Sequence, residues 1–168
     1  MEIKLLPWSM DYLDDLIKYA NNPLIAKNLT DAFPHPYTKE NGIKFIEAVS
    51  KQNPTLVFAI VKENEAIGSI GLHPQVDIYR NNAELGYFLA EPFWGQNIMT
   101  SAINKIVDYA FENLPINRIF AKPFGHNLGS HKALIKSGFI LEGKFEKTLI
   151  KNDELIDEMV FAIRKKEK

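Results

Sequence analysis

The chain has 168 residues, of which 46% are hydrophobic and 24% are charged. Its 20 Lys and Arg residues against 21 Asp and Glu residues give a formal net charge of -1, which excludes the broad basic surface that duplex nucleic acid requires. The absence of cysteine excludes a disulfide framework, a thiolate metal site and a cysteine nucleophile.

The length suits a single domain, 1–168, with one hydrophobic core. The first residues carry charges at Glu2 and Lys4 and are not followed by the apolar run of a secretory signal. No apolar run approaches the roughly 20 residues that a membrane-spanning helix needs. We therefore expect a cytoplasmic protein without a membrane segment.

The segment before Thr55 is predicted to be mainly helical. A short strand is expected around Ile3 and Leu5, and two stretches with apolar residues at helical spacing follow it. Between these helices, 29–37 reads as a loop because its prolines forbid regular structure. The residues expected to cap or end the two helices are Ser9, Asn22-Pro23, Thr38 and Asn53-Pro54.

The remainder alternates strands and helices. Three strands, 55–62, 66–72 and 82–89, are predicted to form an antiparallel meander, and a long helix beginning at Ile98 leads to a parallel strand over 118–122. A helix over 127–137 ends at Gly138 with Phe139 as its hydrophobic partner, and a hairpin of 141–149 and 155–163 completes the chain. The predicted fold is α/β: a mixed, mostly antiparallel sheet of about seven strands, splayed at its middle and flanked by helices.

The passage from Leu89 to Ile98 is the most informative part of the sequence. A buried strand runs through a turn containing Gly95 into a helix N-terminus, whose free N–H groups and partial positive charge favour a phosphate or diphosphate. A nucleoside triphosphate is disfavoured, because neither the P-loop nor the dinucleotide glycine pattern is present. The alternative is that Gly95 only permits a turn and Asn97 only caps the helix.

Two separated groups of residues carry a family resemblance. The first is Ala83-Glu84-Leu85-Gly86-Tyr87 followed by Phe93-Trp94-Gly95-Gln96, and the second is Arg118-Ile119, Ala121, Asn127, Ser130, Leu134, Lys136 and Gly138-Phe139. Together they resemble the GNAT superfamily of acyl-CoA-dependent N-acetyltransferases, within it the branch of the ribosomal-protein N-terminal acetyltransferases. One departure is Asn97, which stands where the family has a second small residue; Asn tolerates the left-handed backbone that this position needs.

The resemblance implies the GNAT fold, acetyl-CoA as cosubstrate and a primary amine as acceptor. It places the pantetheine arm along the backbone of Phe88, Leu89 and Ala90, and Asn127 and Ser130 beside the arm and the thiol. The expected diphosphate-binding residues are Trp94, Gly95, Gln96, Asn97, Ile98, Met99 and Thr100. Helix capping alone would also explain Asn127 and Ser130.

Transfer of an acetyl group to an amine needs a base for the amine and a proton donor for the departing thiolate. Glu84 is the first candidate base, acting through an ordered water by resemblance, and His73 is the second; a surface glutamate is the alternative interpretation of Glu84. Ser130 is the candidate acid. His126 and His131 are expected in solvent, and because the 4 histidines show no ligand spacing, no metal is expected.

The acceptor side is predicted from the aromatic loop before Thr38. Phe33, His35 and Tyr37 lie where the family binds its acceptor, although a core role is the alternative for each aromatic ring. The acceptor is either a protein N-terminal α-amine or a small amine such as a polyamine or an aminoglycoside. A rival interpretation is a non-catalytic acyl-CoA-binding domain. The sequence does not distinguish a monomer from a homodimer.

Overall fold

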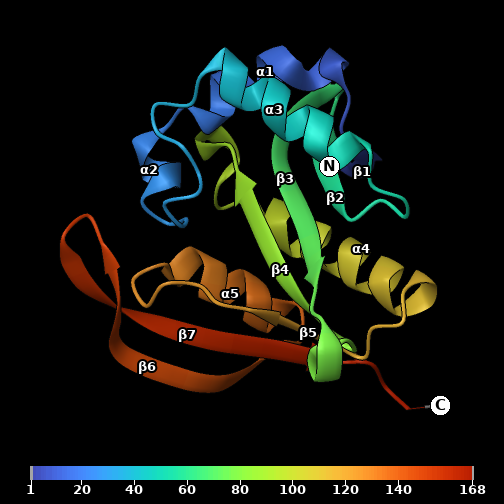
Figure 1. Cartoon of the computed structure of the whole chain (residues 1–168), viewed down its shortest axis with the longest axis vertical. Helices are drawn as coiled ribbons and strands as arrows, with labels where there is room; N and C mark the ends of the chain where they lie inside the picture. The colour runs from blue at the N-terminus through green and yellow to red at the C-terminus, as the bar shows by residue number, and fades with distance from the viewer. Residues whose placement is uncertain (1, 168) are drawn as a thin grey trace. The chain divides into compact units, whose positions relative to one another are not determined.

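The computed structural model of the chain describes residues 2–167 and is drawn in Figure 1. Two compact units are present: the chain up to Gly71 together with Tyr87–Ile98, and Leu72–Gly86 together with the chain from Met99 onward. Two strands, β3 (Glu65–Pro74) and β4 (Asn82–Leu89), contribute residues to both units. The assignment of 1–168 to a single domain stays a prediction.

The first unit combines antiparallel strands with helices. β1 (Lys4–Pro7) pairs with β2 (Val57–Lys62), and β2 pairs with β3 from Val57↔Gly71 to Lys62↔Glu65. Within this unit, α1 and α3 lie side by side (Figure 1). The helical segments are η1 (Met10–Tyr12), α1 (Leu13–Ala20), α2 (Pro23–Ala26), α3 (Lys39–Ser50) and η3 (Glu91–Phe93).

Helix boundaries in this unit follow from local side-chain bonds. Thr38 and Asn41 form a reciprocal capping box at the start of α3, which confirms Thr38 as its cap. The interpretation of Asn22 as only a helix breaker was incomplete. α1 ends at Ala20 with Asn21 as its C-cap, and Asn22 caps the short helix α2: its side-chain oxygen accepts from Leu24 N over 2.9 Å, and Pro23 lies in the first turn.

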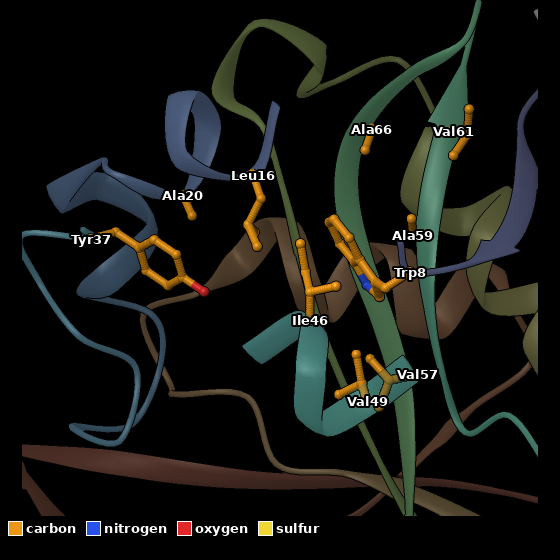
Figure 2. Close-up of a cluster of buried hydrophobic side chains, with 10 residues drawn as sticks. All are labelled: Trp8, Leu16, Ala20, Tyr37, Ile46, Val49, Val57, Ala59, Val61 and Ala66. Atoms are coloured by element: carbon orange, nitrogen blue, oxygen red, sulfur yellow. The ribbon is translucent and has the colours of Figure 1, made fainter. Parts of the chain in front are cut away.

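The core of the first unit forms around Trp8, which is 3% exposed (Figure 2). Its indole N–H donates to the hydroxyl of buried Ser69 over 3.2 Å, so neither polar group is left unsatisfied. Around the indole, Figure 2 shows apolar side chains from the helices and strands of this unit, among them Leu16, Ile46, Val57 and Ala59.

The second unit contains the parallel crossover. α4 (Ile98–Asn113) joins β4 to β5 (Arg118–Ala121), and the two strands pair in parallel from Asn82↔Arg118 to Glu84↔Phe120. The parallel register covers Asn82–Glu84, whereas β4 itself continues to Leu89, which agrees with the predicted splay. The remaining elements are η2 (Asp77–Tyr79), α5 (Leu128–Lys136), β6 (Ile140–Lys151) and β7 (Glu154–Arg164).

The end of α5 is as predicted. Gly138 has φ +88° and donates to Ile135 O, and Phe139 N donates to Leu134 O, so both bonds of a Schellman motif are present. The β6–β7 hairpin turns at Asn152 and Asp153, both with positive φ.

Within residues 2–167, seven strands follow the order β1-β2-β3-β4-β5-β7-β6, and β4–β5 is the parallel pair. The prediction of an α/β fold with a mostly antiparallel sheet is therefore confirmed. In the same part of the chain, none of the helices has the length and hydropathy to span a bilayer.

Candidate active site

The segment Trp94–Thr100, here called the donor loop, has the geometry predicted for an anion site. Gly95 and Asn97 have φ values of +72° and +61°, so Asn97 adopts the left-handed backbone expected of it. Residues 94–97 are exposed, and a Cβ added to Gly95 would meet nothing within 4 Å. The last three residues of the donor loop, 98–100, form the first turn of α4, a helix of 16 residues. These backbone N–H groups can bind a diphosphate without displacing packed side chains.

Side-chain bonds tie the donor loop to the segment before it. Trp94 Nε1 donates to Leu89 O over 2.7 Å, and Gln96 Nε2 donates to Pro92 O over 3.1 Å. Ala90 N donates to Ile67 O over 2.8 Å. Thus the Leu89 carbonyl and the Ala90 N–H, two groups predicted to pair with pantetheine, already have partners within the protein. Leu89 O can still accept a second bond, whereas the Ala90 N–H has no second hydrogen to offer.

The two candidate bases lie on adjacent strands of the second unit. Gln75 N donates to Asn82 O over 2.9 Å, and in an antiparallel ladder this register puts His73 opposite Glu84 on the same face. His73 Nε2 lies 3.7 Å from the position that a Cβ on Gly86 would take, which agrees with this register. Glu84 is half-buried and His73 is exposed. The structure therefore brings the two predicted bases together.

Asn127 caps α5, as the capping interpretation predicted. Its side-chain oxygen accepts from Ser130 N over 3.4 Å, and Ser130 is half-buried in the first turn. The expectation that His131 is solvated was wrong. It is half-buried, its Nε2 lies 3.0 Å from Phe124 O, and its ring packs against Phe161 at 5.4 Å between centroids.

The predicted acceptor residues lie in the first unit. Phe33 contacts Tyr37 and Phe88, with ring centroids 5.2 and 5.5 Å apart, and His35 is exposed. Tyr37 is only 5% exposed and belongs to the hydrophobic core, and burial raises the pKa of its hydroxyl to about 12. Of the three predicted acceptor residues, Phe33 and His35 are thus the more accessible.

Sequence reasoning missed two contacts beside the donor loop. The side chain of Asn22 donates to Glu91 Oε2 over 2.7 Å, and Tyr19 packs edge-on against Phe93 at 6.0 Å. No local signal identifies a pair so far apart in sequence. Within the described residues, no group of three or more His, Asp or Glu side chains is placed to hold a metal ion.

Comparison with known proteins fits this geometry. Residues 2–140 match the family model of the acetyltransferase (GNAT) domain. The chain belongs to the GNAT acetyltransferase family. The prediction of an acetyl-CoA-dependent N-acetyltransferase is therefore confirmed at the level of the family.

Individual relatives agree with this family assignment. An uncharacterized N-acetyltransferase, p20 of Bacillus licheniformis, is 31% identical over 98% of this chain and 94% of its own. The ribosomal-protein-serine acetyltransferase of Escherichia coli (strain K12) is 30% identical over 63% of this chain and 59% of its own length. The crystal structure of microcin C7 self-immunity acetyltransferase MccE, in complex with acetyl-CoA and AMP, superposes with a TM-score of 0.82 at 27% identity. That match covers 97% of this chain and 92% of the other.

Proposed function

We propose that this GNAT protein transfers the acetyl group of acetyl-CoA to the α-amine of a protein N-terminus. The observation that carries the proposal is the donor loop, in which two left-handed residues, Gly95 and Asn97, lead into the N-terminus of α4. Backbone N–H groups at a helix N-terminus suit a diphosphate, and CoA is a diphosphate-containing carrier.

The donor is proposed to lie along two neighbouring segments of the chain. The N–H groups of the donor loop bind the diphosphate, and the partial positive charge of the α4 N-terminus stabilises it. Pantetheine runs beside the backbone of Phe88, Leu89 and Ala90, where Leu89 O is open to a second hydrogen bond.

The proposed chemistry is direct attack by the amine, and acetyl-CoA supplies the acyl thioester. Glu84 removes one proton from the acceptor ammonium, directly or through one water, and His73 opposite it is the alternative base. The C–N bond then forms as the C–S bond breaks. The second amine proton passes to the departing sulfur, with Ser130 as the proposed relay, so that an amide and a neutral thiol result.

A protein N-terminus is supported as acceptor by the similarity to the ribosomal-protein-serine acetyltransferase. A small amine is the second candidate, because the match to MccE, a self-immunity acetyltransferase with AMP in its crystal structure, extends over nearly the whole chain. The two candidates differ in the shape of the acceptor and use the same donor site.

The test is an acceptor panel. The purified chain is incubated with acetyl-CoA and peptides with free Ser or Ala N-termini, N-blocked peptides, spermidine, kanamycin and an aminoacylated nucleotide, and free thiol is measured. We expect turnover with the free N-termini and none with the blocked ones. Turnover with the small amines alone would replace the proposed acceptor. Binding of acetyl-CoA with no turnover would leave a non-catalytic binder, and no binding would overturn the proposal entirely.

A further inference from the structure

The side chain of Trp94 joins the end of β4 to the beginning of the donor loop. Its indole N–H donates to Leu89 O over 2.7 Å. Two main-chain hydrogen bonds lie within the segment 89–94 that the indole bond spans. They run from Phe93 N to Ala90 O over 3.0 Å and from Trp94 N to Glu91 O over 3.1 Å. Because the side chain remains 43% exposed, packing alone does not fix the ring, and the indole bond sets its orientation.

Packing gives the next residues of the loop little support. A Cβ at Gly95 would meet nothing within 4 Å, and residues 94–97 are all exposed. The hydrogen bond from Gln96 Nε2 to Pro92 O also holds the loop, but its acceptor lies within the segment 89–94 that the Trp94 side chain already spans. Glycine loses more backbone entropy on ordering than any other residue, so the part of the donor loop after Trp94, which begins with Gly95, needs such a hydrogen bond to keep its N–H groups aligned.

We infer that Trp94 is a positioning residue, which orders the donor loop through Leu89 O before the donor binds. This inference rests on the proposed function. The sequence predicted that Trp94 contacts the donor, whereas here its side chain acts on the donor indirectly, by holding the backbone of the loop. Ordering the loop in the free protein removes an entropic cost from binding and therefore increases affinity. The reacting acetyl group is untouched, so turnover at saturating acetyl-CoA stays the same.

The sharpest variant removes only the N–H. Replacing Trp94 by L-3-benzothienylalanine puts sulfur where the donor nitrogen was and keeps the ring shape, and Trp94→Phe is the genetic counterpart. We expect the calorimetric Kd for acetyl-CoA to rise about tenfold in both, the effect of one lost hydrogen bond, with kcat unchanged. The same isostere at Trp8 is the matched control, because it deletes the bond to Ser69. It is expected to lower stability and leave the Kd unchanged.

A second measurement needs no ligand. Hydrogen exchange of the Gly95–Ile98 amides is expected to accelerate in both Trp94 variants of the free protein and to be unaffected by the Trp8 control. Unchanged exchange, or an unchanged Kd while the wild type binds acetyl-CoA, overturns the inference. If the wild type binds no acetyl-CoA, the proposed function fails and the affinity role of Trp94 falls with it. A drop in kcat without a change in Kd would make Trp94 part of the chemistry and overturn its role as a positioning residue.

Discussion

Asn22 and Glu91 are joined by a side-chain hydrogen bond of 2.7 Å, although they lie 69 positions apart. The amide of Asn22 donates to Glu91 while its oxygen accepts from Leu24 N at the start of α2. The neighbouring Asn21 accepts from Tyr37 N over 3.0 Å. Two adjacent asparagines thus hold the predicted acceptor segment and the η3 turn that precedes the donor loop.

Two substitutions at Asn22 should separate the contributions of its two side-chain hydrogen bonds to stability. We expect Asn22→Ala to lower the free energy of unfolding by about 2 kcal/mol, since it removes a helix cap and a hydrogen bond. Asn22→Ser keeps a capping oxygen but cannot reach Glu91, so it should cost about half as much. Urea denaturation measures both. Equal losses for Ala and Ser would show that the bond to Glu91 contributes nothing.

Gly68 is predicted to tolerate no side chain. A Cβ there would lie 2.5 Å from Phe88 O and 3.2 Å from Leu89 Cα, both backbone atoms that cannot rotate away. Gly68→Ala should therefore destabilise the protein by about 2 kcal/mol or more, as overpacking does. The matched control is Gly129→Ala in α5, where a Cβ meets nothing within 4 Å and alanine favours the helix. Equal thermal stability of the two variants would contradict the close approach at Gly68.

The buried hydroxyl of Tyr37 predicts a loss of stability at high pH. Burial raises its pKa in the folded state to about 12, against 10.0 for an exposed tyrosine. Between these values the unfolded chain loses the proton and the folded protein keeps it, so folding becomes less favourable as pH rises. The loss should reach about 2–3 kcal/mol by pH 12.

The comparison of wild type with Tyr37→Phe isolates this effect from other titrating groups. The difference in their unfolding free energies should be constant up to about pH 9 and then shift in favour of Phe. Parallel stability curves through pH 12 would show that the hydroxyl ionises normally in the folded protein.

The pairing of His73 with Glu84 allows the proposed base to be identified. Glu84→Gln should lower kcat about 100-fold with an unchanged Kd for acetyl-CoA, because proton removal is impaired and donor binding is not. His73→Gln should have a much smaller effect, and Glu112→Gln, at an exposed position of α4, is the control. If His73→Gln shows the large effect and Glu84→Gln the small one, the roles are exchanged.

Local chemistry was readable from the sequence because it depends on residues a few positions apart. Thr38 caps α3 and Asn127 caps α5, while the backbone N–H groups of Gly138 and Phe139 donate to the last turn of α5. All of these bonds lie within about one turn of a helix end. The antiparallel pairing of 66–72 with 82–89 was likewise predicted from adjacent strands, and the observed register places His73 opposite Glu84. The left-handed turn at Gly95 and Asn97 and the helix start at Ile98 were predictable for the same reason, because both are local patterns, whereas their role in donor binding stays a prediction.

Long-range bonds could not be predicted in this way. The pair Asn22–Glu91 depends on how separate segments pack, and neither residue has a neighbour that signals the other. Similarly, the burial of His131 depends on Phe124 and Phe161, contributed by a loop and a distant strand. Both features are tertiary, so periodicity and capping rules do not contain them.

Gly125 and Asp157 provide a test of how the segment before α5 is held. Gly125 N donates to Asp157 O over 2.9 Å, and a Cβ at Gly125 would lie 2.8 Å from the Cβ of Asp157. Gly125→Ala should therefore destabilise the protein by about 1–3 kcal/mol. Asp157→Gly should also destabilise it, because the Asp157 side chain accepts from Lys147 N over 2.8 Å. Asp157→Gly removes the Cβ that Gly125→Ala would meet. The loss of unfolding free energy in the double variant should therefore be about 1 kcal/mol smaller than the sum of the losses in the two single variants. Simple additivity in urea denaturation would show that the segment moves aside and that Gly125 is not required for its docking on β7.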